Sequence, residues 1–197
     1  MSNLIPFNSL PATAQAIIKH TVSIEGGYVN DPNDSGGATK YGVTEKKARQ
    51  YGYTGDMRDL PIDFAYAIAA HEFWFGAKMD QVAQISWEVA EEMFDTGYNC
   101  GPGSAWKIAQ RMLNLMNRQG ADWPDIVADG IPGPKTFSAL EAAVKRRGAL
   151  HVFKCFNAGQ CAYYIDLAER RPKDEAFFNG WISASVDTTP KVVKLGN

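Results

Sequence analysis

A glutamate at the end of a helical pattern is the acid in this sequence best placed to do chemistry. Glu25 opens the stretch EGGYVNDPNDSGGATKYGVT, which runs to Thr44, and it directly precedes Gly26 and Gly27. The apolar residues before it recur at helical spacing, so we expect the negative end of a helix dipole beside its carboxyl group. Partial burial beneath the following loop would act in the same direction, because desolvation disfavours the charged form. Both effects predict a raised pKa and a carboxyl group that keeps its proton near neutral pH.

A protonated carboxyl group of this kind suits glycoside hydrolysis, in which it donates a proton to the leaving oxygen. An ordinary glutamate titrates near pH ~4.3, so its pKa would have to rise by about two units. Asp34, nine residues after Glu25, can supply a second carboxylate that steers water or stabilises positive charge on a sugar ring. Asp31, which precedes Pro32, has the simpler alternative of a turn former.

Other interpretations of this loop are possible. A polar hairpin with glycine turns and a capping glutamate would explain its composition without catalysis. The run that starts at Asp31 also resembles the opening of an EF-hand, but Gly42 stands at the twelfth position, where a bidentate glutamate is required. We therefore expect no calcium site and no metal.

The histidines and cysteines indicate little further chemistry. His71 lacks the second histidine of the zinc-protease pattern, since Phe75 stands four residues later. The three cysteines are irregularly spaced, which disfavours a disulfide framework or a zinc site and favours synthesis in a reducing compartment. A thiol hydrolase built from Cys100 and His151 is an alternative that rests on one pair of residues. No cofactor is expected.

The composition of the whole chain is that of an ordinary globular protein. Its 197 residues, 45% hydrophobic and 21% charged, suit one domain or one domain with two lobes. The net charge of −2 gives no general attraction to nucleic acid or anionic lipid. No apolar stretch approaches the roughly 18 residues of a membrane span. We expect a monomer with no nucleic-acid partner and no membrane-spanning segment.

Helical spacing alternates with cap and turn signals along the chain, which predicts a mostly α fold. Residues 26–43 are rich in Gly, Asn and Asp, and they predict a small β-hairpin or loop with extended ends at Tyr28, Val29, Tyr41 and Val43. The expected helices span residues 11–25, 44–50, 61–75, 86–99, 104–120, 134–148, 149–171 and 174–185.

The first motif closely resembles the signature of glycoside hydrolase family 108, the muramidases related to secretion activators and phage endolysins. The likeness continues through the Trp74 segment and FDTGYNCGPGSAWKIAQRMLN, residues 94–114. VADGIPGPKTFSAL is similar to the family's predicted peptidoglycan-binding region, and FFNGW to its C-terminal element. The resemblance covers roughly residues 10–185. It implies a lysozyme-like fold with two helical lobes, a catalytic one over 10–100 and a peptidoglycan-binding-like one over 101–190.

The resemblance also implies an activity and its catalytic residues. The reaction is cleavage of the β-1,4 bond between N-acetylmuramic acid and N-acetylglucosamine, with Glu25 as the catalytic acid. The loop is similar to the Glu–Asp–Thr triad of phage lysozymes, with Asp34 at the matching distance. Lys40 then falls at the threonine position, so Thr39 and Thr44, which flank it, are both candidates for the third member. Inversion and retention both stay open.

Aromatic and amide side chains are candidates for contacts with the sugars. The rings of Tyr28, Tyr41, Trp74 and Tyr98 can stack on sugar faces, and Asn99 can bond an acetamido group. Each residue has an alternative role in core or loop packing. The position of Trp74 within an apolar helix favours the core.

Two other functions compete with hydrolysis. A lytic transglycosylase needs one acid and no water, and its product would bear a 1,6-anhydro end. A non-catalytic cell-wall-binding or secretion-associated module would retain the fold without the activity. The intact Glu25 and its loop favour an enzyme instead.

The sequence leaves the biological setting open between a phage endolysin, a secretion activator and another agent of bacteriolysis. The start, MSNLIPFNSLPATAQ, has no charged n-region and no apolar run, so no Sec signal is expected. We therefore expect synthesis in the cytoplasm, passage through a holin or a secretion apparatus, and action on glycan strands in the periplasm or cell wall.

Overall fold

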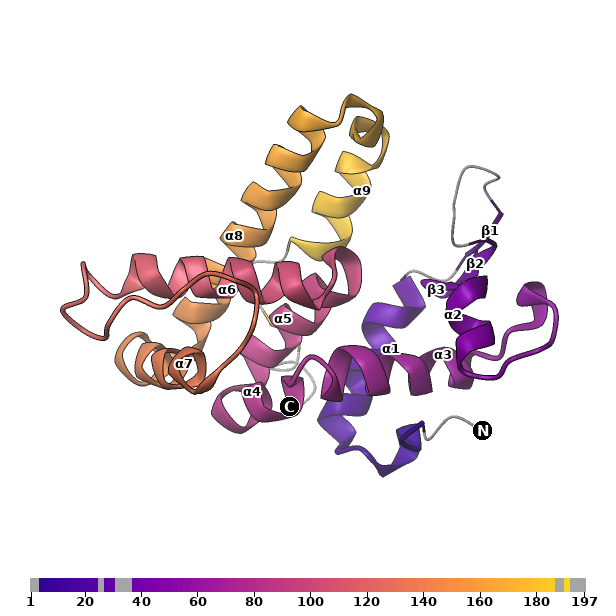
Figure 1. The fold of residues 1–197 in the computed structure, drawn as a ribbon, viewed down its shortest axis with the longest axis horizontal. Helices are drawn as coiled ribbons and strands as arrows, with labels where there is room; N and C mark the ends of the chain where they lie inside the picture. Colours follow the sequence, from indigo (N-terminus) through magenta and orange to yellow (C-terminus); the bar gives the residue numbers. More distant parts are fainter. Residues whose placement is uncertain (1–3, 25–26, 31–36, 187–189, 192–197) are drawn as a thin grey trace. The chain divides into compact units, whose positions relative to one another are not determined.

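The computed structural model describes residues 4–24, 27–30, 37–186 and 190–191 (Figure 1). Glu25 and Asp34 lie outside the described residues, as does Asp31. The chain forms two units, Met1–Gly76 and Ala77–Asn197. The functional boundary expected at residue 100 stays a prediction.

The helices of the first unit are placed by their apolar residues. α1 (Ala12–Ile24) packs on α3 (Ile62–Ala69), and α2 (Glu45–Gln50) follows the small sheet. The α1 residues Ala14, Ile17, Ile18 and Val22 are buried, and their spacing puts them on one face of the helix. The helix expected over residues 11–25 is confirmed from Ala12 to Ile24.

The small sheet lies between α1 and α2 in the chain. Its antiparallel strands are β1 (Tyr28–Val29), β2 (Thr39–Lys40) and β3 (Val43–Thr44), in that order. Tyr41 and Gly42 join β2 to β3 with φ angles of 53° and 72°. Two successive positive φ angles are typical of a type I′ hairpin turn. The predicted hairpin is confirmed, but the expectation of an extended Tyr41 is wrong, because this residue forms the turn.

The apolar segment after Pro61 changes its helical form part-way. The sequence predicts one helix over residues 61–75, whereas α3 ends at Ala69 and a π-helix follows over Ala70–Phe75. Short π-helical turns are rare and occur frequently at functional sites. This one contains His71, Glu72 and Trp74.

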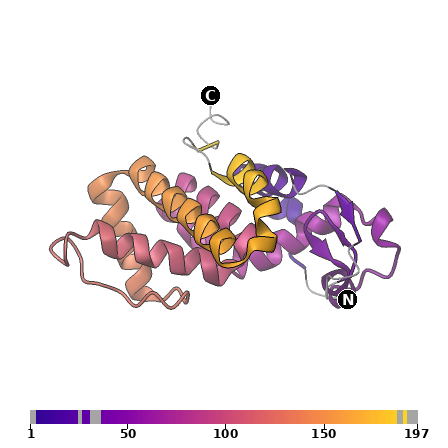
Figure 2. The same ribbon diagram turned by 90° about the horizontal axis from the view of Figure 1, so that it is seen from above.

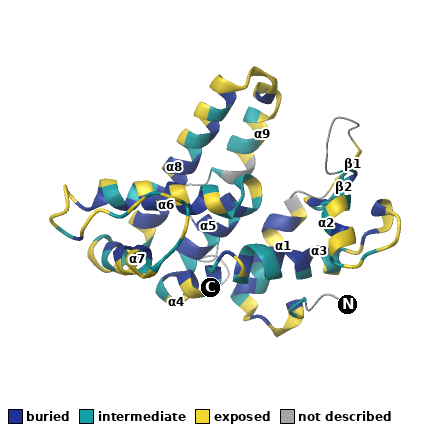
Figure 3. Ribbon diagram, viewed as in Figure 1, coloured by how far each residue is buried: buried dark blue, intermediate teal, exposed yellow. Residues whose placement is uncertain are grey.

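The second unit is a bundle of helices around α5. Figure 3 shows many buried residues on α5, which packs against α4, α6 and α8, and Figure 2 shows α8 and α9 side by side. The helices are α4 (Met79–Ile85), α5 (Trp87–Cys100), α6 (Pro102–Met116), α7 (Pro134–Arg147), α8 (Ala149–Arg170) and α9 (Glu175–Ser185).

Local signals explain most of these helix ends. The Ser86 hydroxyl caps α5 by accepting a hydrogen bond from the N–H of Val89 at 3.2 Å. Gly148, with φ of 85°, ends α7 as expected. The expected end of α6 at Gly120 is wrong, because the helix stops at Met116.

The expected class, mostly α with a small β-hairpin after the first helix, is confirmed. Within the described residues, none of the helices has the length and apolarity needed to cross a membrane.

Candidate functional site

The end of α1 is where the sequence predicts the catalytic acid. α1 is described as far as Ile24, and Glu25 is the next residue in the sequence. Helix ends of this kind carry a partial negative charge from their last carbonyl groups. The position expected for Glu25, at the end of this helix, stays a prediction because Glu25 lies outside the described residues. Its role as the catalytic acid stays a prediction.

The two candidate threonines of the sheet differ in their hydrogen bonds. Thr39 lies on the central strand and pairs with Val29 on one side and Thr44 on the other. Its hydroxyl oxygen is buried and has no hydrogen-bond partner among the described residues. The Thr44 hydroxyl accepts a hydrogen bond from the N–H of Lys47 at 3.3 Å and caps α2. A buried hydroxyl without a partner is costly by roughly 1–3 kcal/mol, which makes Thr39 the better candidate for a functional group.

Lys40, the residue in the threonine register, is held by its own neighbours. Its ammonium donates a hydrogen bond to the carbonyl oxygen of Arg58. It also lies 5.1 Å from the ring centroid of Tyr41, at the β2–β3 turn. These contacts give Lys40 a structural role in the sheet.

A polar pocket of about 290 Å³ lies beside β1 in the first unit. Tyr28 lines it, and the guanidinium of Arg58 covers this ring at 5.0 Å from the centroid. Asp56 accepts a hydrogen bond from the N–H of Arg58 at 2.8 Å, which lowers the pKa of its carboxyl group. Glu45 and Arg49 also line the pocket. This lining of charged side chains and one tyrosine suits sugar hydroxyl and acetamido groups.

The π-helix carries a carboxylate that the sequence analysis did not single out. Glu72 accepts hydrogen bonds from the Lys47 ammonium and from the Tyr51 hydroxyl, both at 2.7 Å. Burial, together with the hydrogen bond and negative charge of Glu72, raises the pKa of Tyr51 to about 12. No signal marks Glu72 in the sequence, because its partners come from α2 and the residue after it.

The remaining predicted sugar contacts take different positions. Trp74 is 2% exposed, so its ring belongs to the core of the first unit. Tyr98 is half-buried and stacks on Phe94, with ring centroids 6.0 Å apart. Asn99 is exposed, and its amide donates a hydrogen bond to Asp95 at 3.4 Å. The burial of Trp74 therefore favours core packing over a sugar contact for this residue.

Burial counts against the thiol-hydrolase alternative. The pKa of the Cys100 thiol is raised to about 11, chiefly by burial and further by the charge of Asp95. The thiolate is the nucleophilic form, and it is scarce at neutral pH when the pKa is this high. All three cysteines are unpaired, and no metal-binding group of three or more His, Cys, Asp or Glu side chains occurs in the described part of the chain.

The turn DGIPGPKT of the second unit is organised by one buried amide. The Gln110 side-chain nitrogen lies 3.1 Å from the Asp129 carboxylate and 3.2 Å from the Ile131 carbonyl. Its oxygen accepts the N–H of Gly130 at 2.7 Å. The hydrogen bond from the N–H of Ile131 is the main cause that lowers the pKa of the Asp129 carboxyl group. The hydrogen bond from the Gln110 amide lowers it further. The turn thus has a clear structural function, and it leads into the first turn of α7.

Two known protein domains match the two halves of the chain. The profile of glycosyl hydrolase 108 matches residues 18–101, and that of a predicted peptidoglycan domain matches residues 104–186. Residues 18–101 thus form a glycosyl hydrolase 108 domain, and the expected resemblance to this family is confirmed. No curated protein sequence matches it.

A solved structure is similar over nearly the whole length of this chain. It is that of SagA from Brucella abortus, with a TM-score of 0.67 over 92% of this chain and 94% of the other, at 22% identity. This similarity shows the fold, and the expected lysozyme-like class is confirmed. The two matched domains together support a glycoside hydrolase with peptidoglycan as its substrate.

Proposed function

We propose that this protein is an N-acetylmuramidase with Glu25 as its general acid. It would cleave the β-1,4 bond between N-acetylmuramic acid and N-acetylglucosamine in glycan strands. The observation that carries the proposal is the match of residues 18–101 to a glycosyl hydrolase, within which α1 is described as far as Ile24, the residue before Glu25. A carboxyl group beside the negative end of a helix retains its proton to higher pH, as a general acid must.

The sheet after α1 supports a second catalytic group in the same region. The buried hydroxyl of Thr39 is suited to hold a water molecule or a carboxylate, whereas the Thr44 hydroxyl already caps α2. Asp34 supplies the second carboxylate in this proposal. Tyr28, on the rim of the polar pocket, is the aromatic side chain we assign to sugar contacts in the first unit.

The activity is tested on outer-membrane-permeabilised Gram-negative cells and on purified peptidoglycan. The parent protein should clear the cell suspension, and Glu25→Gln should abolish clearing while the helical circular dichroism signal is kept. Asp34→Ala should cost less than Glu25→Gln, yet still at least tenfold. Glu169→Gln, the same chemical change at an exposed position of α8, serves as the control and should clear at the parental rate.

The products distinguish the enzymatic alternatives. A muramidase leaves N-acetylmuramic acid at the reducing ends, which mass spectrometry of the fragments identifies. A 1,6-anhydro end would instead establish a lytic transglycosylase. If Glu25→Gln clears cells as fast as the parent, Glu25 is not the acid. Because peptidoglycan lies outside the cytoplasmic membrane, we propose the periplasm or cell wall as the place of action.

A further inference from the structure

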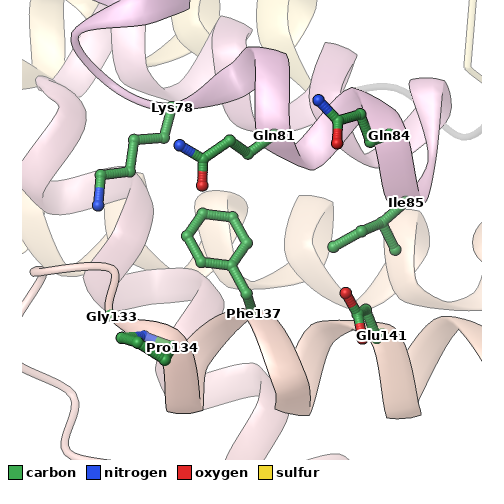
Figure 4. A pocket seen from close by; sticks show the side chains of 8 residues that line it. All are labelled: Lys78, Gln81, Gln84, Ile85, Gly133, Pro134, Phe137 and Glu141. Atoms are coloured by element: carbon green, nitrogen blue, oxygen red, sulfur yellow. The ribbon is translucent and has the colours of Figure 1, made fainter.

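A groove of about 570 Å³ runs between α4 and α7 in the second unit (Figure 4). Lys78 and Glu141 lie at opposite ends of its lining, and the amides of Gln81 and Gln84 project from α4 between them. The ring of Phe137 stands in the middle, on the α7 side. The groove thus offers a cation towards one end, an anion towards the other, and amide and aromatic groups on its two walls.

Buried contacts hold the cationic end of this groove in place. The buried Trp106 donates a hydrogen bond from its indole nitrogen to the carbonyl of Ala77 at 2.9 Å, next to Lys78. The same indole packs edge-on against Phe137, with ring centroids 5.5 Å apart. Trp106 therefore fixes both walls, and a rigid groove loses less entropy when it binds a ligand.

Lys78 adopts an unusual backbone conformation at this end. Its φ of 64° is left-handed, which is uncommon for a residue other than glycine. The ammonium donates a hydrogen bond to the carbonyl of Pro132, just before α7, at 3.0 Å and lies 5.9 Å from the Phe137 centroid. An ammonium has three donors, so this bond leaves capacity for a ligand. Within the described residues, neither Lys78 nor Glu141 forms an ion pair with another side chain.

The length of the groove sets the size of its ligand. The lining residues of α7 extend from Pro134 to Glu141, and those of α4 from Lys78 to Ile85. Seven residues of helix span about 10 Å. An extended peptide covers this distance in roughly three residues. The ligand is therefore short, with charges of opposite sign about 10 Å apart.

We infer that this groove binds the peptide stem of peptidoglycan, which rests on the proposed function because that function makes peptidoglycan the substrate. A stem peptide has free carboxylates, which Lys78 attracts, and a diamino acid whose ammonium Glu141 attracts. The amides of Gln81 and Gln84 match its peptide bonds, and Phe137 matches its aliphatic chain. A bare glycan, with uncharged hydroxyl and acetamido groups, would leave both charged residues unused. Charge complementarity thus favours the stem over the glycan.

The test measures binding of the free tripeptide L-alanyl-γ-D-glutamyl-meso-diaminopimelate to the full chain by calorimetry or NMR titration. We expect saturable binding that Lys78→Glu and Glu141→Lys each weaken at least tenfold. Glu141 is exposed and Lys78 is half-buried, and neither forms an ion pair among the described residues, so circular dichroism should be unchanged. The matched control is Lys135→Glu, which lies on α7 beside a different pocket and should change the affinity less than twofold.

Three results would overturn the inference: no saturable binding of the tripeptide, equal affinity in parent and charge-reversed variants, or competition by an N-acetylglucosamine tetramer. Hydrolysis of peptidoglycan stripped of its stems tests the proposed function by itself. A protein that cuts stripped glycan but does not bind the tripeptide refutes the groove assignment alone. A protein that binds the tripeptide but cuts no glycan refutes the muramidase alone.

Discussion

The hydroxyl of Tyr51 donates a 2.7 Å hydrogen bond to Glu72 and thereby ties the end of α2 to the π-helix. Lys47 donates to the same carboxylate oxygen, also at 2.7 Å. The π-helix replaces the regular continuation of α3, so these contacts stabilise a segment whose backbone bonding is less favourable than that of an α-helix. Tyr51 is the neutral member of the cluster, and its protonation state controls whether the contact is attractive.

This contact predicts a loss of stability at high pH. The pKa of Tyr51 is raised from 10.0 to about 12, chiefly by burial. The contribution of Tyr51 to the stability of the fold is therefore complete below pH 10.0 and is lost as the pH rises toward 12. Tyr51→Phe should lower the free energy of unfolding by about 1–2 kcal/mol at pH 8. Urea unfolding of both proteins at pH 8, 10 and 11 should show the difference shrinking with pH. A difference that stays constant across this range would contradict the assignment to Tyr51.

The two threonines of the sheet should respond oppositely to loss of their hydroxyl groups. Thr39→Val removes a buried hydroxyl that has no partner among the described residues, so stability should be kept while clearing activity falls at least tenfold. Thr44→Ala removes the cap of α2 and should lower the unfolding free energy by about 1 kcal/mol.

Thr44→Ser is the matched control for the cap, because it restores the hydroxyl and should recover most of the lost stability. Urea unfolding and cell clearing measured on the same preparations separate the two effects. Full activity in Thr39→Val would remove Thr39 from the proposed mechanism and leave its burial as a feature of the sheet.

Helices with local signals at their ends could be predicted from the sequence. Ser86 and Thr44 cap the helices that follow them, and Gly148 separates α7 from α8 as its position after a basic turn indicates. These signals act through neighbouring backbone groups, so they do not depend on the rest of the fold. α4 was missed because it has seven residues and starts after the left-handed Lys78, without a side-chain cap.

The candidate sites depend on contacts that are distant in sequence, and these could be predicted only in part. The motif of Glu25 lies within one continuous stretch, so its pattern is visible in the sequence. The groove between α4 and α7 combines two segments that are far apart in the sequence, and neither segment has the pattern of a site by itself. The end of α6 at Met116 also lacks a local signal, because the left-handed Arg118 and Gln119 that follow are not glycines.

The ion pairs of Asp122 predict that the protein loses stability in acid. Its side chain is 2% exposed and pairs with Arg118 at 2.8 Å, with Arg146 at 3.3 Å and with Arg147. The hydrogen bond from Arg118 is the main cause that lowers the pKa of this carboxyl group below its ordinary 3.8. The contribution is therefore present above pH 3.8 and is lost as the pH falls through the lowered pKa.

Asp122→Asn should unfold at a lower temperature than the parent at pH 7, and the difference should diminish as the pH falls below about 4. The matched control is Asp166→Asn, which breaks an exposed ion pair with Arg170 on α8 and should change the melting temperature little. Equal losses in the two variants, read by circular dichroism, would mean that the Asp122 cluster has no special role in closing the loop before α7.

Substitution of Gly130 should show how tightly the turn before α7 is held against α6. Its φ is 81°, and a Cβ atom placed on it would lie 2.6 Å from the carbonyl oxygen of Gly103 at the start of α6. Gly130→Ala combines left-handed strain, about 1–2 kcal/mol, with a contact against backbone that cannot move aside easily. Gly133→Ala is the matched control, since Gly133 has φ of −111° and no atom within 4 Å of the added carbon. Urea unfolding should show a clear loss for Gly130→Ala and little change or a slight gain for Gly133→Ala. Equal midpoints for the two variants would show that the turn moves away from α6 at little cost, and that Gln110 alone does not hold it in place.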